Sequence, residues 1–464
     1  MRRAIEAVAI SVQRRLSQIG RRLAPAAAVG LAACAGTPGG AGALGGSDIA
    51  LIQDAMKQVE TSYVEPVKPD QLVTGALKGM LSRLDPHSDY MDEQEYRELM
   101  TVTSGQFGGV GIEISVEQGV PQVVSAIEGT PAAAAGIEPG DRIVKADGQA
   151  TVGMDIEDIV KRLRGVPGTR VVLTIARANR PLFDVPITRA VIHVESVKSD
   201  LEPGNVAYIR ISTFGETTPV ELAAAITRLR QRAGGRFNGF VLDLRNDAGG
   251  LLDSAVDVAG GFLDGAPIVT TRGRESEENQ AYAAPARGDA IRGTPMVVLI
   301  NGASASASEI VAGALQDDHR ATVLGTRSFG KGSVQSIIPL EGRGALRLTT
   351  ALYYTPSGRS IQGQGISPDM VVTLPKDEQV ANAVMTYESD LYGALKNGGA
   401  LGPEGNEPSA ARPGATPARA APGRSAAGAD AGDRPINPKI IGTAGDSQLK
   451  AALAFLQRPR AVAR

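Results

Sequence analysis

The residues best suited to chemistry lie in two short segments, NGASASASE at 301–309 and GTRSFGKGS at 325–333. The first segment holds Ser304, Ser306 and Ser308, after the apolar run PMVVLI and before a helical pattern. A serine at a strand-to-helix junction suits a nucleophile, because its hydroxyl can be exposed at a sheet edge and the helix N-terminus is electropositive. The same letters also fit a helix-capping box, in which Ser306 and Glu309 are purely structural.

The second segment places Lys331 between Gly330 and Gly332. It nearly matches a phosphate-binding loop, but Gly332 stands where that motif needs Ser or Thr, and a strand-like stretch follows where it needs a helix. Ser328 and Lys331 also match S-x-x-K, but each flanking glycine disfavours the required helix by about 1 kcal/mol. We reject both interpretations and consider Lys331 as a general base, since desolvation can bring a lysine pKa toward neutrality. Ser-Lys pairs are a variant of the catalytic triad.

Composition narrows the classes of function. The three histidines, His87, His193 and His319, lie in separate segments, so a Ser-His-Asp triad stays open without a supporting motif. A net charge of -2 argues against a nucleic-acid binder. Hydrophobic residues make up 42% of the chain and there is no Trp, so Val, Ile, Leu and Ala must build the cores. We expect neither a metal site nor a cofactor.

The first residues have the layout of an export signal. Arginines precede a short apolar run, and small residues follow it. The stretch Leu31-Ala32-Ala33-Cys34 resembles a bacterial lipobox, so we interpret residues 1–34 as a signal peptide whose Cys34 is lipidated. Alternatively, Cys34 is incidental in an Ala-rich signal peptide. Both interpretations predict a protein of the periplasm or cell envelope, and the first anchors it to a membrane. Residues 35–47 are Gly-rich and read as a flexible tether.

The remaining pattern predicts an α/β multidomain protein. Residues 48–103 show helical spacing and form an N-terminal helical domain. Residues 104–190 show short alternating strands, turn signals and one amphipathic helix. Strands and helices alternate over 191–375, which predicts an α/β core with a mixed sheet. We further expect a helical extension at 376–396, a disordered Ala/Pro/Gly linker at 397–435 and a C-terminal helical segment at 436–464.

The pattern of 104–190 resembles a PDZ domain. In such domains a Gly-rich loop can hold a carboxylate on bare backbone N–H groups, and the bound peptide adds as an extra strand. That loop falls on Gly109, Val110, Gly111 and Ile112. Considered alone, the same glycines are an ordinary turn before a strand.

Several ordered motifs together resemble the carboxyl-terminal processing peptidases, a family of PDZ-containing serine proteases from bacteria and chloroplasts. The resemblance spans about residues 48–375, most of the folded chain. Besides the PDZ segment, the similar motifs are LDPHSDY at 84–90, VLDLRNDAGGLL at 241–252, the serine segment at 302–317, the lysine segment at 325–335 and YYTPSGRSIQGQGISPD at 353–369.

The resemblance implies roles for individual residues. It selects Ser306 as the nucleophile, Lys331 as the general base and Gln335 as the residue that orients the lysine. The oxyanion hole would use the backbone N–H of Ala307 and one from the Gly249-Gly250 turn, with Gly249 favoured. This chain has Asp247-Ala248 where the family commonly has Asn-Pro, which predicts a less rigid turn.

The resemblance therefore implies an exported serine endopeptidase that cleaves proteins near their C-termini. Its partners would be polypeptides bound by their C-termini through the PDZ domain, and the membrane through Cys34, but not nucleic acid. An adaptor protein and a homo-oligomer are compatible with the sequence. Arg164 is a candidate contact between the PDZ and protease domains. The alternative is a catalytically silent, PDZ-containing lipoprotein that only scaffolds peptides.

Overall fold

The computed structural model describes residues 45–117, 119–154, 156–380, 385–397 and 435–458. The predicted signal peptide with Cys34, nearly all of the tether and nearly all of the Ala/Pro/Gly linker lie outside these residues. The chain divides into two compact units, Met1–Pro69 and Asp70–Arg464. The first unit contains α2 (Gly46–Ser62), the helix predicted to follow the tether, in which no residue is buried.

The predicted helical domain over 48–103 is not one body. The unit that starts at Asp70 takes up its later elements, α3 (Pro69–Leu81), β1 (Asp89–Met91) and α4 (Glu93–Ser104). The strand β1 was not predicted, because it pairs in antiparallel register with residues 345–347 of β18, far along the chain. Three residues give no alternation of their own, so only tertiary pairing makes them a strand.

The strand pattern predicted for 104–190 is confirmed. One sheet has the order β3-β4-β5-β7-β8, with β6 paired to β5, and a separate ribbon pairs β2 with β9. Along β7 buried residues alternate with more exposed ones, and Val171, Leu173 and Ile175 enter a core shared with Ile159 of α6. The elements are β2 (Gln106–Gly109), β3 (Ile112–Glu117), β4 (Val120–Ala126), α5 (Pro131–Ala134), β5 (Arg142–Ala146), β6 (Gln149–Ala150), α6 (Ile156–Leu163), β7 (Arg170–Ala176), β8 (Phe183–Thr188) and β9 (Ala190–His193).

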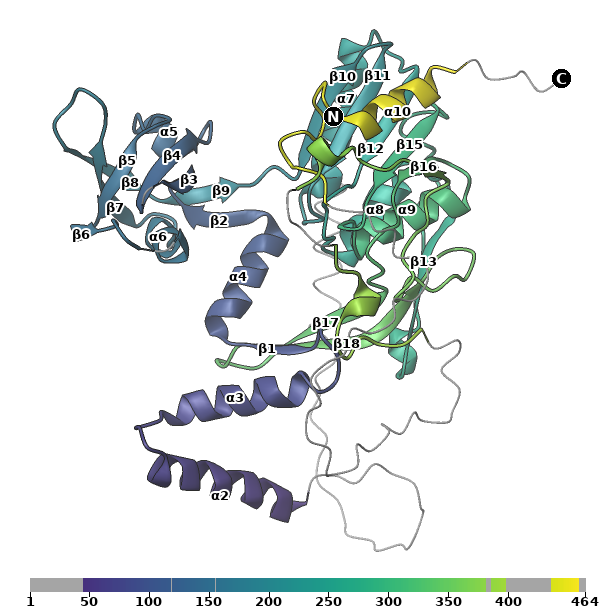
Figure 1. The fold of residues 1–464 in the computed structure, drawn as a ribbon. Helices are drawn as coiled ribbons and strands as arrows, with labels where there is room; N and C mark the ends of the chain where they lie inside the picture. Colours follow the sequence, from purple (N-terminus) through teal and green to yellow (C-terminus); the bar gives the residue numbers. More distant parts are fainter. Residues whose placement is uncertain (1–44, 118, 155, 381–384, 398–434, 459–464) are drawn as a thin grey trace, which may run out of the picture. The chain divides into compact units, whose positions relative to one another are not determined.

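The predicted α/β core has a mixed sheet of order β10-β11-β12-β15-β16-β19 (Figure 1). The pair β10–β11 is antiparallel and the remaining pairs are parallel. The short apolar runs that predicted strands became β11, β12, β15 and β16. The elements are β10 (Val197–Glu202), β11 (Val206–Ile211), α7 (Thr218–Arg232), β12 (Gly239–Asp243), α8 (Leu252–Gly260), β15 (Met296–Ile300), α9 (Ala307–Asp317), β16 (Thr322–Gly325) and β19 (Met370–Val371).

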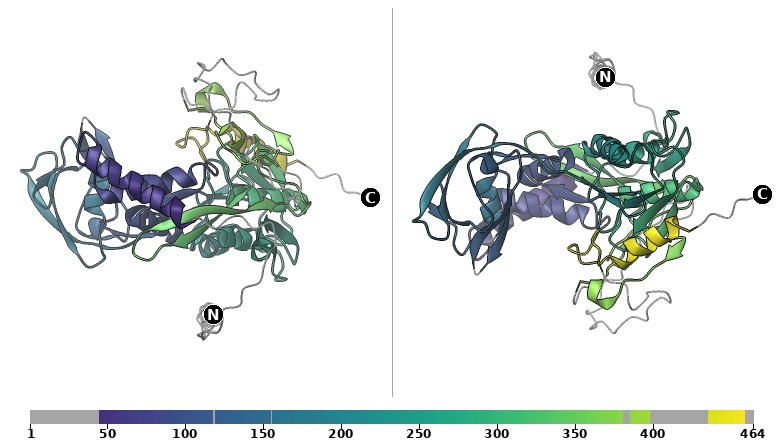
Figure 2. Two further views of the ribbon diagram at one scale, coloured as in Figure 1. Left: turned by 90° about the horizontal axis from the view of Figure 1, so that it is seen from below. Right: turned by 90° about the horizontal axis from the view of Figure 1, so that it is seen from above.

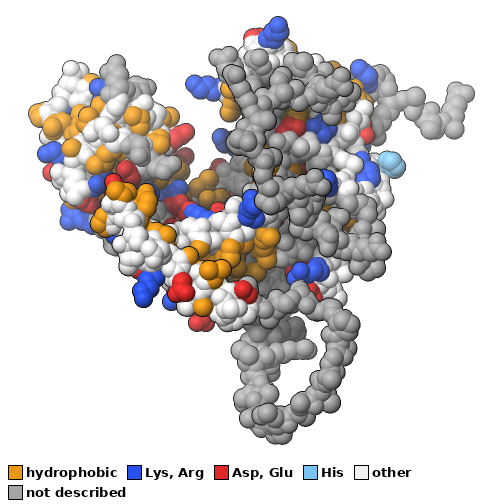
Figure 3. Space-filling model, turned by 60° about the horizontal axis from the view of Figure 1, so that its bottom comes forward, with side chains coloured by type: hydrophobic (Ala, Val, Ile, Leu, Met, Phe, Trp, Pro, Cys, Tyr) orange, Lys and Arg blue, Asp and Glu red, His pale blue; other side chains and the backbone are white. Residues whose placement is uncertain are grey.

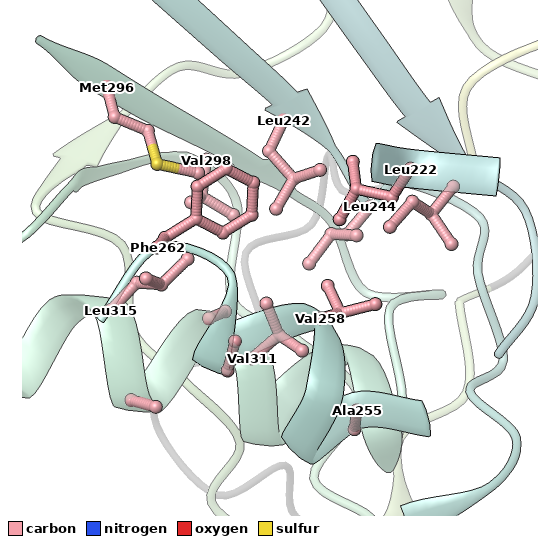
Figure 4. Packing of buried hydrophobic residues seen from close by; sticks show 14 of the residues in the cluster. Leu222, Leu242, Leu244, Ala255, Val258, Phe262, Met296, Val298, Val311 and Leu315 are labelled. Atoms are coloured by element: carbon pink, nitrogen blue, oxygen red, sulfur yellow. The ribbon is translucent and has the colours of Figure 1, made fainter. Parts of the chain in front are cut away.

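Both faces of this sheet are covered, as expected for parallel strands. One face packs against α7, α8 and α9, through side chains such as Leu242, Val298 and Val311 (Figure 4). The other face packs against α10 (Ser447–Leu456), whose Leu449 and Ala452 are buried against it (Figure 2). This helix confirms the predicted C-terminal helix.

A buried ion cluster ties the C-terminal segment to the sheet. The guanidinium of Arg245 donates to both carboxylate oxygens of Asp446, at 2.9 and 2.6 Å, and its Nε donates to Asp243 at 2.9 Å. All three residues are fully buried. The bidentate geometry supplies the pairing that a buried charge needs.

A second sheet contains the strand that follows the lysine segment. It has the order β1-β18-β13-β14, and β17 also pairs with β18. All of its pairs are antiparallel. Its other strands are β13 (Pro267–Gly273), β14 (Ala281–Ala283), β17 (Ser333–Pro339) and β18 (Ala345–Tyr354), and the 3-10 helix η1 (Ser276–Glu278) lies between β13 and β14 in the chain.

The predicted helical extension over 376–396 is wrong where its residues are described. The structure has two single-turn 3-10 helices there, η2 (Lys376–Glu378) and η3 (Glu388–Asp390). Apart from the hydrogen bonds within these single turns, two backbone amides of the segment bond to distant parts of the chain instead of extending a helix. The Val380 amide donates to the Pro435 carbonyl at 2.8 Å, and the Glu388 amide to the Phe329 carbonyl at 3.1 Å.

The surface mixes charges of both signs. On the face drawn in Figure 3, Lys and Arg side chains are interspersed with Asp and Glu side chains and with hydrophobic ones. None of the helices in the described ranges combines the length and the apolar character that crossing a membrane requires. In the same ranges, no group of three or more His, Cys, Asp or Glu residues is arranged to hold a metal ion.

Candidate active site

Ser306 stands at the turn between β15 and α9, where it is the N-cap of the helix. Its φ of 55° and ψ of -110° lie outside the regions that L-residues favour. Backbone strain of this kind concentrates at functional sites, and a sharp strand-to-helix turn can expose a nucleophilic hydroxyl.

The three neighbouring serines are not equivalent. The Ser304 hydroxyl donates to the Leu244 carbonyl at 2.7 Å, and the Ser308 hydroxyl donates to the Asp247 carbonyl at 3.1 Å. Both serines are fully buried, whereas Ser306 keeps 7% of its surface exposed. The Ser306 hydroxyl interacts with the phenol of Tyr353. Burial raises the pKa of that phenol above its ordinary value, and the contact with Ser306 offsets only part of the rise. Two of the three hydroxyls are therefore committed to the backbone, and Ser306 is left as the candidate nucleophile.

The carboxylate of Glu309 joins the serine turn to the lysine loop. Its Oε2 accepts hydrogen bonds from the Ser306 amide at 2.8 Å and from the Lys331 amide at 2.9 Å. Its Oε1 accepts from the Gly330 amide at 2.7 Å and from the Ser328 hydroxyl at 2.5 Å. Burial raises the pKa of Glu309 to about 7, and these four donors act in the opposite direction. Glu309 therefore does more than cap the helix, because the same carboxylate also binds the amide of Lys331, 22 residues further along the chain.

Glycines allow the lysine loop to pass close to other backbone. A Cβ on Gly332 would lie 2.3 Å from the Gln362 amide nitrogen, and Gly330 has a φ of +100°. The chain then enters β17, as the strand-like letters predicted, so the helix that a phosphate-binding loop needs is not formed. Ser328 is fully buried and bonded to Glu309, which agrees with the rejection of S-x-x-K.

Lys331 has the electrostatics of a base. Although the residue is only partly buried, desolvation lowers the pKa of its amine to about 8. The nearby carboxylates of Glu388, Glu309 and Asp85 oppose that change, and Arg347 adds to it. A lysine pKa near neutrality leaves a useful fraction of free amine.

Gln335 lies beside Lys331, as the resemblance implied. The Lys331 ammonium donates to the Gln335 side-chain carbonyl, and also to the Ser333 carbonyl at 3.4 Å. The pairing of β17 with β18 shifts register between Val334 and Gln335. Irregularities of this kind can re-aim a side chain. Among the hydrogen bonds of the described residues, none joins the Lys331 amine directly to the Ser306 hydroxyl.

The two candidate oxyanion glycines have different neighbours. A Cβ on Gly249 would lie 2.9 Å from both the Ser306 Cβ and the Ala307 nitrogen, whereas a Cβ on Gly250 would meet the backbone of Phe214. Gly249 is therefore the glycine beside the serine turn, as the sequence analysis favoured. Its amide donates to Asp247 Oδ1 at 2.8 Å. Ala307 is the first residue of α9, where amides have no intrahelical partner.

A group of polar residues around Lys331 was not identified from the sequence. The buried carboxylate of Glu388 contacts the His87 ring at 2.7 Å and the Gln362 amide at 2.8 Å. Thr349 contacts the Gln335 side-chain amide, and Asp85 in turn contacts Thr349. The signals for them were two of the motifs found in the sequence, since Asp85 and His87 belong to LDPHSDY and Gln362 belongs to YYTPSGRSIQGQGISPD.

The predicted peptide-binding loop adjoins a free sheet edge. Among the described strands β3 pairs only with β4, so its other edge can accept an added strand. Gly111 has a φ of +80°, and a Cβ there would lie 2.3 Å from Thr130. Val110 is buried in the core of the domain. The Arg164 guanidinium stacks on the Phe107 ring of β2 at 4.7 Å, so its contact with the protease domain stays a prediction.

Three family models match the chain in the predicted order. An activating protease CtpB N-terminal domain matches residues 37–95, a PDZ domain matches 122–177, and peptidase family S41 matches 205–372. Together with the fold, these matches define a serine-type peptidase with a PDZ domain before its catalytic core.

Individual relatives narrow this class. A carboxy-terminal-processing protease of Bartonella bacilliformis is 48% identical over 352 residues, which are 75% of this chain and 80% of that protein. The carboxy-terminal processing protease CtpA of Bacillus subtilis is 34% identical over 349 residues, 74% of either chain. A solved photosystem II D1 C-terminal processing protease is 30% identical, covers 70% of this chain and 92% of its own, and has a TM-score of 0.41.

The chain belongs to peptidase family S41, among the carboxy-terminal processing proteases. The resemblance inferred from the sequence is thereby confirmed. The alternative of a catalytically silent scaffold receives no support from these relatives.

Proposed function

We propose that this protease is an exported endopeptidase that cleaves proteins near their C-termini through a dyad of Ser306 and Lys331, assisted by Gln335. The observation that carries the proposal is the shared Glu309 oxygen, which accepts from the amides of both dyad residues. A single carboxylate thus holds the strained serine turn and the lysine loop side by side. The pKa of Lys331, lowered to about 8 by burial, supports its role as base.

The chemistry begins with a change of partner for the lysine. Its flexible side chain turns from the Ser333 carbonyl toward Ser306 Oγ while it keeps the Gln335 contact. Catalytic hydrogen bonds often tighten only when substrate is bound. The neutral amine takes the Oγ proton as Oγ attacks a peptide carbonyl. The Lys331 ammonium then gives that proton to the leaving amine, and water hydrolyses the acyl-enzyme by the reverse transfers.

The oxyanion that develops during attack needs fixed donors. The backbone N–H of Ala307 at the start of α9 and that of Gly249 are proposed for this role, with Gly249 exchanging Asp247 Oδ1 for the oxyanion. The position of Gly249 against the Ser306 Cβ supports this assignment over Gly250.

Delivery of substrate is assigned to the PDZ domain. The free edge of β3 suits an added strand, and the turn at Gly109, Val110, Gly111 and Ile112 suits a terminal carboxylate. A substrate whose C-terminus is amidated should therefore be cleaved more slowly than its free-acid form. Equal rates for the two forms would count against delivery by the carboxylate.

Export and anchoring are proposed from the sequence alone, with Cys34 as the lipidated residue in the periplasm or cell envelope. Cys34→Ser should move the protein from the membrane fraction to the soluble fraction. An unchanged distribution would refute the anchor.

The dyad is tested with two variants and two matched controls. Ser306→Ala and Lys331→Ala should each abolish cleavage of labelled casein at pH 8, while the circular dichroism spectrum stays that of the wild type. Ser276→Ala and Lys376→Ala change exposed residues of the same types and should retain full activity. Full activity in either dyad variant would remove that residue from the mechanism.

A further inference from the structure

A chain of hydrogen bonds leads from the Lys331–Gln335 pair to a segment near the start of the second unit. The Gln335 amide nitrogen donates to Thr349 Oγ1 at 3.2 Å, and Thr349 Oγ1 in turn donates to Asp85 Oδ1 at 3.1 Å. Asp85 and Thr349 are 264 residues apart in sequence and meet because β1 pairs with β18. Asp85 is buried, with 5% of its surface exposed.

The direction of each hydrogen bond in this chain is dictated by its two ends. Asp85 as a carboxylate can only accept, and its Oδ1 also accepts from the amides of His87 at 2.8 Å and Ser88 at 2.9 Å. The Thr349 hydroxyl must therefore give its proton to Asp85, which leaves its oxygen as an acceptor. At the other end the Lys331 ammonium can only donate.

We infer that Asp85 and Thr349 are positioning residues that fix the orientation of the Gln335 side-chain amide. Because Thr349 presents only an acceptor, the NH2 of Gln335 faces Thr349 and its carbonyl oxygen faces Lys331. The Ser333 hydroxyl, 3.0 Å from the same NH2, can donate or accept and so does not enforce this orientation. This inference rests on the proposed function, since it concerns the geometry of the proposed base.

The orientation decides where the lone pair of the neutral lysine points. A Gln335 carbonyl accepts one N–H of the amine, which leaves the lone pair free for the Ser306 proton. An amide turned the other way would donate its NH2 to that lone pair and occupy the base. It would also place positive hydrogens against the ammonium, which disfavours the protonated form.

The closing experiment removes the constraint without changing charge. Thr349→Val keeps the shape of the side chain and deletes the hydroxyl, and Thr349→Ser restores it. Thr350→Val is the matched control, because Thr350 has similar burial on the same strand and bonds instead with Ser336 and Glu278. The assay measures kcat and KM for labelled casein from pH 6 to 9.5, with melting temperatures for every variant.

We expect Thr349→Val to lower kcat by about 10- to 100-fold, since a misplacement of about 1 Å can cost about 100-fold. KM should change little, and the acid limb of kcat/KM should move to lower pH. Thr349→Ser should recover both the rate and the limb, and Thr350→Val should match the wild type. The charged groups around the amine, Glu388, Glu309, Arg347 and Asp85, are unchanged in all three variants.

Three outcomes would overturn the inference: a wild-type kcat in Thr349→Val, a loss of rate without movement of the acid limb, or no recovery in Thr349→Ser. If Thr349→Val fails to fold, Thr349→Ala provides the second test, because it also deletes the hydroxyl and leaves every charge around the amine unchanged. It should lower kcat and move the acid limb in the same direction. Ser306→Ala and Lys331→Ala in the same assay separate the two proposals: if both stay active, the dyad itself fails, and if both are inactive while Thr349→Val is normal, only this inference fails.

Discussion

The two halves of the candidate site are held by different means. The serine half sits on the covered parallel sheet: β15 leads directly into the turn, α9 follows it, and the neighbouring residues of that turn are almost all buried. The lysine half sits on a loop and an antiparallel hairpin whose residues are mostly only partly buried. Within the hairpin Gln335 bonds to Thr349, and two side chains from other segments hold this half: Asp85 accepts from Thr349, and Glu309 accepts from the Lys331 amide.

This difference suggests which half can change. A close-packed core resists small displacements, whereas hydrogen bonds from partly exposed side chains can exchange partners. The nucleophile is therefore the fixed point and the base the adjustable one. Adjustment of the lysine half would change the rate without unfolding the enzyme, because the packed core is untouched.

The largest effect is expected from removing the residue that both halves share. Glu309→Ala leaves four donors without an acceptor, three of them buried and the Lys331 amide partly buried. Each buried donor left unpaired costs about 1–3 kcal/mol. The sum is a large share of a typical folding stability of about 5–15 kcal/mol. Urea unfolding measures this loss of folding free energy directly. The stability of Glu309→Gln should lie between those of Glu309→Ala and the wild type, because glutamine keeps one acceptor oxygen.

Glu341→Ala, an exposed position in the turn between β17 and β18, is the control and should unfold like the wild type. A Glu309→Ala protein that unfolds within about 1 kcal/mol of the control would show that the carboxylate is not a shared anchor.

A smaller effect, confined to the serine half, is expected for Gly249→Ala. Its φ of +97° is unfavourable for alanine, and the new methyl would lie 2.7 Å from the Ala305 carbonyl and 2.9 Å from the Ser306 Cβ. The strain should push the nucleophile aside and lower kcat by about 100-fold. Gly288→Ala shares a positive φ of +79° but meets no atom within 4 Å, so it should lose about 1–2 kcal/mol of stability and no activity. Equal activities of the two variants would contradict the placement of Gly249.

Local features of the site could be predicted from the sequence, whereas its tertiary contacts could not. The serine turn, the glycine-flanked lysine loop and the strand after it could be predicted because turn residues, glycines and β-branched letters act over a few positions. The choice of Ser306 among the three serines came from the family resemblance and not from the local pattern. The bond between Glu309 and the lysine loop, and that between Asp85 and Thr349, join segments whose separation leaves no periodic signal. The same limit explains the error at 376–396, where Glu388 pairs with Phe329 instead of continuing a helix.

The smallest expected effect is on the pH dependence of folding stability, and it comes from a buried carboxyl in the serine half. Asp247 is fully buried, its Oδ1 accepts from Gly249, and its Oδ2 has no hydrogen-bond partner within the described residues. Burial raises the pKa of Asp247 from an ordinary value of 3.8 to about 7. Between these two pH values the unfolded chain releases a proton that the folded chain keeps, so the contribution of Asp247 to stability falls as pH rises, and it is constant above about 7.

Asp247→Asn removes this titration, so the melting temperature of the variant relative to the wild type should rise from pH 4 to pH 8. Any pH-independent cost of the new amide cancels in that comparison, as does the titration of Glu309, which both proteins share. Asp377→Asn, at an exposed position of η2, should give a flat difference over the same range. A flat difference for Asp247→Asn as well would mean that the fixed half relaxes around this carboxylate, and that the contrast between the two halves is weaker than their packing suggests.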